Sequence, residues 1–209
     1  MTRRFCALLV LVAIPLTSAC LVKTTTHRLY LSPQGALTWT VLDHDVRSNE
    51  SNPSNRTSEE QTFLDDVASG THPALEALNL LGPYQSSARL LRADRPYAVL
   101  TEARFERVDA VVGKLFSELQ IPGKATLQRA GDEWTLIVTI DLPALRDDGE
   151  PDSPAAALIE ELDAYRVILT EGRFVAATGF EILDEGAVAA LKADRIPTDR
   201  PAELRLTWR

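Results

Sequence analysis

The chain has 209 residues, of which 45% are hydrophobic and 25% are charged, and its formal net charge at pH 7 is −8. These fractions are typical of a globular protein and exclude a disordered or collagen-like chain. The negative charge argues against a nucleic-acid-binding protein, which needs a basic face. Two cysteines are too few for a disulfide-rich scaffold or a four-cysteine zinc site.

The N-terminal segment has the three parts of a secretory signal peptide. A basic start with Arg3 and Arg4 precedes the uncharged segment 5–16, and the small residues 17–19 then lead to Cys20. The apolar segment is shorter than the roughly 20 residues that a transmembrane helix needs. We therefore expect a segment that directs export and is then removed.

The segment Leu16-Thr17-Ser18-Ala19-Cys20 resembles the lipobox of bacterial lipoproteins. It departs from the commonest form because Thr17 occupies the position where leucine is usual. The resemblance implies cleavage between Ala19 and Cys20 and the attachment of fatty acids such as palmitate at Cys20. The alternative is an ordinary secretory signal cut after Ala19, which would leave Cys20 as a free thiol.

The residue after the cysteine is Leu21. In Gram-negative lipoproteins an aspartate at this position tends to retain the protein in the inner membrane. The resemblance therefore implies the outer membrane, facing the periplasm, in a cell that has one. The expected organisation is a signal peptide at 1–19, a short tether at 20–26 and a single domain at 27–209. A domain boundary near Gly82 or Pro143 is the alternative.

Strands are predicted where apolar residues alternate, and helices where they repeat every three to four positions. In chain order we expect strands at 27–31 and 37–46, helices from 58 to 70 and 73 to 81, strands at 87–92 and 96–105, a helix at 108–119, strands at 124–129 and 133–142, a helix at 153–164, and strands at 165–170, 173–178, 180–183, 187–190 and 204–208. Short turns with glycine join most strand pairs, which favours antiparallel pairing. The predicted fold class is α+β: an antiparallel sheet built from hairpins, with about four helices packed mainly on one face.

The cluster Asp43, His44 and Asp45 is the most suggestive of chemistry. On a strand the two carboxylates would share a face and the imidazole would point the other way, so the three cannot easily bind one ion. At a strand end, His27 could join them across the hairpin as a metal ligand. The simpler interpretation is a polar strand end that enters a loop.

The common nucleophilic, metal-dependent and phosphate-binding enzyme motifs are missing from the sequence. We therefore expect no cofactor and favour a protein without catalytic activity. The leading hypothesis is a membrane-anchored extracytoplasmic lipoprotein that binds or scaffolds, with the membrane as its partner and no nucleic acid. The second is a carrier of a lipid or other apolar ligand, since a curved sheet under helices can enclose a cavity. The third is a hydrolase or metal site around His44.

Overall fold

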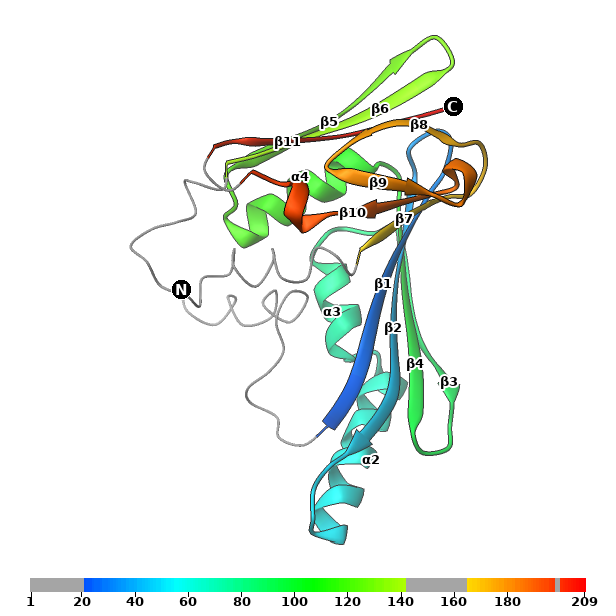
Figure 1. Cartoon of the computed structure of the whole chain (residues 1–209). Helices are drawn as coiled ribbons and strands as arrows, with labels where there is room; N and C mark the ends of the chain where they lie inside the picture. The colour runs from blue at the N-terminus through cyan, green and yellow to red at the C-terminus, as the bar shows by residue number, and fades with distance from the viewer. Residues whose placement is uncertain (1–20, 142–164, 198–199) are drawn as a thin grey trace.

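The computed structural model describes residues 21–141, 165–197 and 200–209. Within these residues the strands form two sheets (Figure 1), in the orders β3-β4-β2-β1-β7-β10-β9 and β5-β6-β11-β8. The strands of the seven-stranded sheet are β1 (Leu21–Leu31), β2 (Leu37–Ser48), β3 (Gln85–Arg92), β4 (Tyr97–Phe105), β7 (Arg166–Leu169), β9 (Phe180–Leu183) and β10 (Val188–Leu191). Those of the four-stranded sheet are β5 (Gly123–Ala130), β6 (Glu133–Ile140), β8 (Phe174–Thr178) and β11 (Ala202–Trp208).

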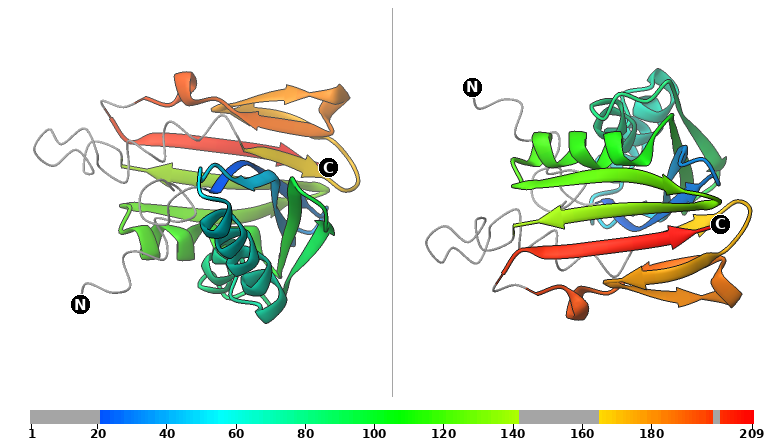
Figure 2. Two further views of the ribbon diagram at one scale, coloured as in Figure 1. Left: turned by 90° about the horizontal axis from the view of Figure 1, so that it is seen from below. Right: turned by 90° about the horizontal axis from the view of Figure 1, so that it is seen from above.

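Three α-helices lie within the described residues. They are α2 (Pro53–Ser69), α3 (Pro73–Asn79) and α4 (Val108–Leu119), and the short 3₁₀ turns are η3 (Asp184–Gly186) and η4 (Ala193–Arg195). Helices α2 and α3 contact strands β2, β3 and β4 of the seven-stranded sheet, whereas α4 contacts β5 of the other sheet. Figure 2 shows α4 alongside β5 in the view from above.

The prediction of one antiparallel sheet with about four helices on one face is wrong. The described strands are divided between two sheets, the helices are divided between them as well, and β1 pairs with β7 in the parallel direction. Turn residues specify which neighbouring strands form a hairpin, but not which hairpins share a sheet. The chain passes from one sheet to the other at Gly179, between β8 and β9. The predicted helix at 153–164 lies outside the described residues.

The first hairpin forms where the sequence predicts it, but β1 is longer than expected. It begins at Leu21, so residues 21–26, expected to form a tether, pair with β2 as far as Ser48. The turn depends on Gly35, which has a φ of 89°. The turn therefore needs glycine for its backbone conformation. A Cβ atom at this position would also overlap the side chain of Leu127 in β5, which would have to move.

Helix α2 begins earlier than its predicted start near Ser58. The side chain of Asn52 caps the helix by accepting hydrogen bonds from the backbone N–H of Ser54 at 2.9 Å and of Asn55 at 3.3 Å. The hydroxyl of Thr57, the residue before the predicted start, donates to the carbonyl of Pro53 within the helix. The start of α2 is therefore determined by the cap at Asn52 together with Pro53 at the first helical position.

The apolar side chains form two clusters. The larger one lies between the two sheets and includes α4, whose predicted span 108–119 is confirmed and whose Val111 and Phe116 are buried. The smaller one lies under α2 and contains Val46, Phe63, Val67 and Val99. Strand β2 contributes to both clusters, which places its middle at the boundary between them.

Candidate functional site

A cavity of about 160 Å³ lies between the two sheets. Its walls come from β1, β2 and β7 on one side, from β6 and β11 on the other, and from α4, β9 and β10. The lining side chains are Leu29, Leu31, Leu37, Trp39, Val108, Val111, Val112, Leu115, Phe116, Leu136, Val138, Ile140, Tyr165, Val167, Phe180, Leu191, Leu204 and Leu206. The cavity is comparable in volume to an engineered apolar cavity of about 150 Å³ that stays dry and binds benzene.

The period of the strands explains why these side chains meet. Alternate residues of a strand share a face, so Leu29 and Leu31 of β1 lie opposite Trp39 and Leu37 of β2. On the other sheet, Leu136 pairs with Leu206 across β6 and β11. The apolar stripe of α4 fills the space beside them.

The cavity is almost wholly apolar. None of its described lining residues is charged, and only Trp39 and Tyr165 carry polar side-chain atoms. The indole Nε1 of Trp39 donates a hydrogen bond to Nδ1 of His27 at 3.2 Å. This N–H group therefore already has a partner outside the cavity lining. A polar ligand placed here would lose its hydrogen bonds to water, whereas a hydrocarbon would lose none.

A polar layer lies beside the cavity on the same face of β1 and β2. The carboxylate of Asp43, which is 1% exposed, accepts hydrogen bonds from Lys23 Nζ at 2.8 Å and from Thr25 Oγ1 at 2.6 Å. Nε2 of His72 lies 3.5 Å from the same carboxylate. Because Asp43 is charged and almost fully buried, these partners are needed to offset the cost of removing it from water.

Two buried histidines flank Asp43. Burial lowers the pKa of His27 from 6.5 to about 4, while nearby Asp43 acts in the opposite direction. The imidazole of His27 stacks on the ring of Tyr165 with centroids 5.1 Å apart, and its Nδ1 accepts from Trp39, so the neutral ring carries its proton on Nε2. Burial also lowers the pKa of His72. Both rings are therefore neutral at pH 7 and add no charge to the cavity wall.

The predicted trio 43–45 is not assembled into one site. Asp45 has a φ of 55° at a bulge in β2, which interrupts the alternation of the strand. Asp43 thus points into the molecule, whereas His44 and Asp45 are 38% and 51% exposed and contact each other at 3.0 Å. The hydrogen bond from His44 lowers the pKa of Asp45. Val46 returns to the buried face.

The described residues do not contain the group of metal-ligating side chains that the metal hypothesis requires. No group of three or more His, Cys, Asp or Glu side chains within residues 21–141, 165–197 and 200–209 is placed to hold a metal ion. His27, the proposed fourth ligand, uses its Nδ1 for Trp39. Ala19 and Cys20, the predicted cleavage and lipid-attachment positions, lie outside the described residues.

The sequence does not predict that His72 lies beside Asp43. His72 precedes Pro73 at the start of α3, and its position beside Asp43 depends on the packing of α3 against the sheet, which has no local signal. The carrier hypothesis expects an apolar cavity under helices that cover one sheet, whereas the structure places the cavity between two sheets. Among the described residues, no helix has the length and mean hydropathy needed to cross a membrane.

No protein-family model matches the chain, and no curated protein matches its sequence. Among solved structures, the chain is similar to the NMR structure of the folded domain of the LppM protein from Mycobacterium tuberculosis. The likeness covers 94% of this chain and 95% of that chain, at 11% sequence identity and a TM-score of 0.39. At this level the likeness shows neither a family nor a function.

Proposed function

We propose that the chain is an extracytoplasmic lipoprotein, anchored to a membrane through Cys20, whose two-sheet domain binds an apolar ligand without catalysis. The anchor rests on the signal-like segment that ends in Ala19 and Cys20. The outer membrane, facing the periplasm, is the proposed location in a Gram-negative cell. The binding activity rests on one observation, the apolar cavity between the sheets.

The size and lining of the cavity favour a hydrocarbon such as part of a lipid acyl chain. A well-packed core leaves few voids larger than a water molecule. A void of about 160 Å³ would cost stability, at about 24 cal/mol per Å³ of cavity, if it had no occupant. A bound apolar group would recover the lost dispersion contacts and bury its own surface.

The ligand hypothesis is tested with the full chain in a mild detergent and the fluorescent apolar probe N-phenyl-1-naphthylamine. Val112, which is partly buried and lines the cavity, is replaced by phenylalanine to fill it. We expect probe fluorescence to rise with the wild-type chain and to fall at least about threefold with Val112→Phe, since the pocket volume is lost. The matched control is Leu91→Phe, at a residue that is 47% exposed and outside the cavity. Equal probe binding by the two variants would contradict the hypothesis.

The anchor is tested separately by growing cells with an azido fatty acid and detecting the label on the protein. We expect the wild type to carry the label and to sediment with membranes, and Cys20→Ala to lose both properties. Cys6→Ala is the matched control, because Cys6 lies in the segment that is removed, and it should keep the label. A wild type without label would overturn the anchor while leaving the cavity hypothesis intact.

A further inference from the structure

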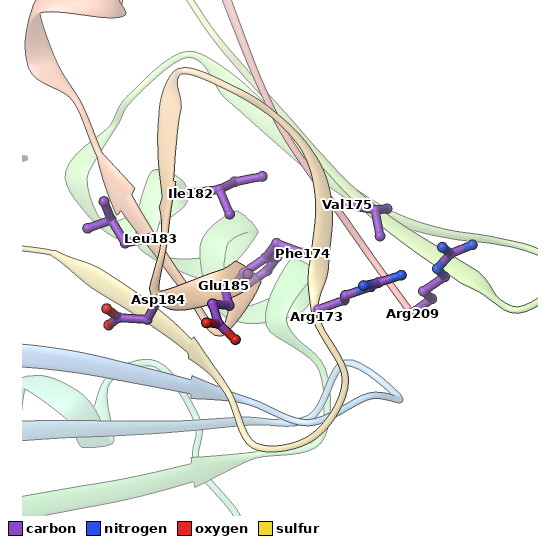
Figure 3. Close-up of a pocket in the computed structure, with 9 residues that line it drawn as sticks. Arg173, Phe174, Val175, Ile182, Leu183, Asp184, Glu185 and Arg209 are labelled. Atoms are coloured by element: carbon purple, nitrogen blue, oxygen red, sulfur yellow. The ribbon is translucent and has the colours of Figure 1, made fainter.

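A hollow of about 600 Å³ lies on the surface where the edges of the two sheets meet (Figure 3). Within the described residues, β8 pairs only with β11, and β9 pairs only with β10. Each strand therefore has one edge without a neighbouring strand, and both strands contribute residues to the same hollow. Gly186 of η3 lies against the backbone of Phe174 and covers this part of β8, so the edge of β9 is the one open to an added strand. Unpaired edges offer backbone N–H and C=O groups to an added strand.

The hollow also carries exposed apolar side chains. Six large hydrophobic residues are exposed in the described part of the chain, and two of them, Val175 of β8 and Ile182 of β9, line this hollow. Figure 3 shows Ile182 extending from the ribbon of β9 toward that of β8. An extended peptide could place alternate apolar side chains against them.

The charges of the hollow are separated. Arg173 and Arg209 lie directly opposite each other, because each backbone N–H donates to the other residue's carbonyl, at 2.9 and 3.1 Å. Like charges opposite each other in a sheet are unfavourable, and Arg173 forms no ion pair with any described residue. The contact of Arg209 with Glu133 is long, at 3.9 Å.

Two carboxylates lie on the other side of the hollow. Asp184 and Glu185 of η3 line it, and neither forms an ion pair within the described residues. Figure 3 shows the side chain of Asp184 pointing away from Arg173, whose side chain extends toward Arg209. The hollow thus has a basic end and an acidic end, with apolar side chains between them.

We propose that this hollow binds an extended peptide segment of a partner protein, which adds as a strand to the edge of β9. The segment carries a carboxylate that meets Arg173 and Arg209, apolar side chains against Val175 and Ile182, and a cationic group near the acidic end. This interaction is independent of the apolar cavity and of the membrane anchor. A soluble peptide is bound on the outer surface while the space between the sheets stays available to its own ligand.

The test measures fluorescence anisotropy of the labelled peptide KTVTVE with the full chain in mild detergent. We expect saturable binding at peptide concentrations below about 1 mM, the range of weak peptide recognition. The variant Arg173→Glu should weaken binding at least about tenfold, because the carboxylate then meets a like charge. The peptide KTVTVK should restore the affinity of this variant. A peptide of the same sequence with alternate backbone amides N-methylated should not bind, because it cannot donate to a strand edge.

The matched control is Arg89→Glu, an exposed arginine of β3, which forms the edge of the seven-stranded sheet opposite to β9. It should bind KTVTVE like the wild type. Absence of binding, or equal weakening by Arg173→Glu and Arg89→Glu, would overturn the proposal. A chain that dimerises without peptide, and loses this property in Ile182→Lys, would identify a second copy as the occupant and would also overturn it. None of these outcomes changes probe binding in the cavity, so the two proposals fail separately.

Discussion

The indole N–H of Trp208 donates a hydrogen bond to the carbonyl oxygen of Pro33 at 3.0 Å. Trp208 lies in β11 of the four-stranded sheet, whereas Pro33 lies in the turn between β1 and β2 of the other sheet. The indole is fully buried and packs edge-on against Phe174, with ring centroids 6.4 Å apart. This pair therefore joins the last strand of one sheet to the first hairpin of the other.

Replacing Trp208 with phenylalanine should destabilise the domain by about 1–3 kcal/mol, because the partly buried hydrogen bond to Pro33 is lost and the smaller ring leaves space in a fully buried position. Urea-induced unfolding followed by circular dichroism measures this difference. Trp134→Phe is the matched control, since Trp134 is only partly buried and lies under the guanidinium of Arg129 at 5.6 Å; we expect less than about 1 kcal/mol. Equal losses in the two variants would contradict a structural role for the Trp208–Pro33 hydrogen bond.

Replacing Asp43 with asparagine should cost about 1–3 kcal/mol of unfolding free energy, because Lys23 and Thr25 lose the anion that they bind. Asp45→Asn is the control, since that carboxylate is 51% exposed and should contribute less than about 1 kcal/mol. The same urea titration compares the two. If Asp43→Asn were as stable as the wild type, the polar layer would have no role in holding β1 against β2.

Stability should fall as the pH is lowered from 6.5 toward 4. Burial lowers the pKa of His27 to about 4 in the folded state, whereas the ordinary value is 6.5. Between these values the unfolded chain binds a proton that the folded chain excludes, so acid favours unfolding. The unfolding free energy that depends on a neutral His27 is fully present above pH 6.5. It amounts to about 3 kcal/mol and is lost as the pH falls from 6.5 to about 4.

The measurement is urea unfolding of the wild type and of His27→Gln at pH 7.5 and at pH 4.5. Glutamine can accept the hydrogen bond from Trp39 but does not titrate. The difference in stability between the two pH values should be smaller for the variant than for the wild type. Identical pH dependence in the two proteins would show that His27 titrates normally and is not buried as described.

Replacing Gly35 with alanine should destabilise the domain by about 1–3 kcal/mol. An alanine at this position would be held in an unfavourable left-handed backbone conformation. Its Cβ atom would also overlap the side chain of Leu127. Gly131→Ala is the matched control, because Gly131 has a φ of 61° but no atom within 4 Å of the added Cβ. It should cost about 1 kcal/mol from backbone strain alone. A larger loss at Gly131 than at Gly35 would contradict the close packing of the first turn against β5.

The parts of the fold that follow from local chemistry could be predicted from the sequence. The apolar stripe of 108–119 gave the correct bounds of α4, and the turn at 32–35 correctly joined β1 to β2. Both depend on residues within one turn or one helix. The partition into two sheets could not be predicted in this way, because the pairing of β1 with β7 joins segments that are distant in the sequence.

The candidate site shows the same division. The polar character of 43–45 is visible in the sequence, but the bulge at Asp45 separates the three side chains, and an aspartate with a positive φ has no reliable local signal. His72 reaches Asp43 only through tertiary packing. The cavity depends on how far apart two sheets are held, and this distance is set by many side chains together.

Strand β1 begins at Leu21, one position after the proposed lipid-attachment residue. Its residues 28–31 pair with both β2 and β7, whereas 21–27 pair with β2 alone among the described strands. A membrane anchor at Cys20 would therefore act on the domain directly at the end of a strand. Any tension on the anchor reaches the pairing of β1 with β2 first, and this pairing extends from Leu21 to Leu31.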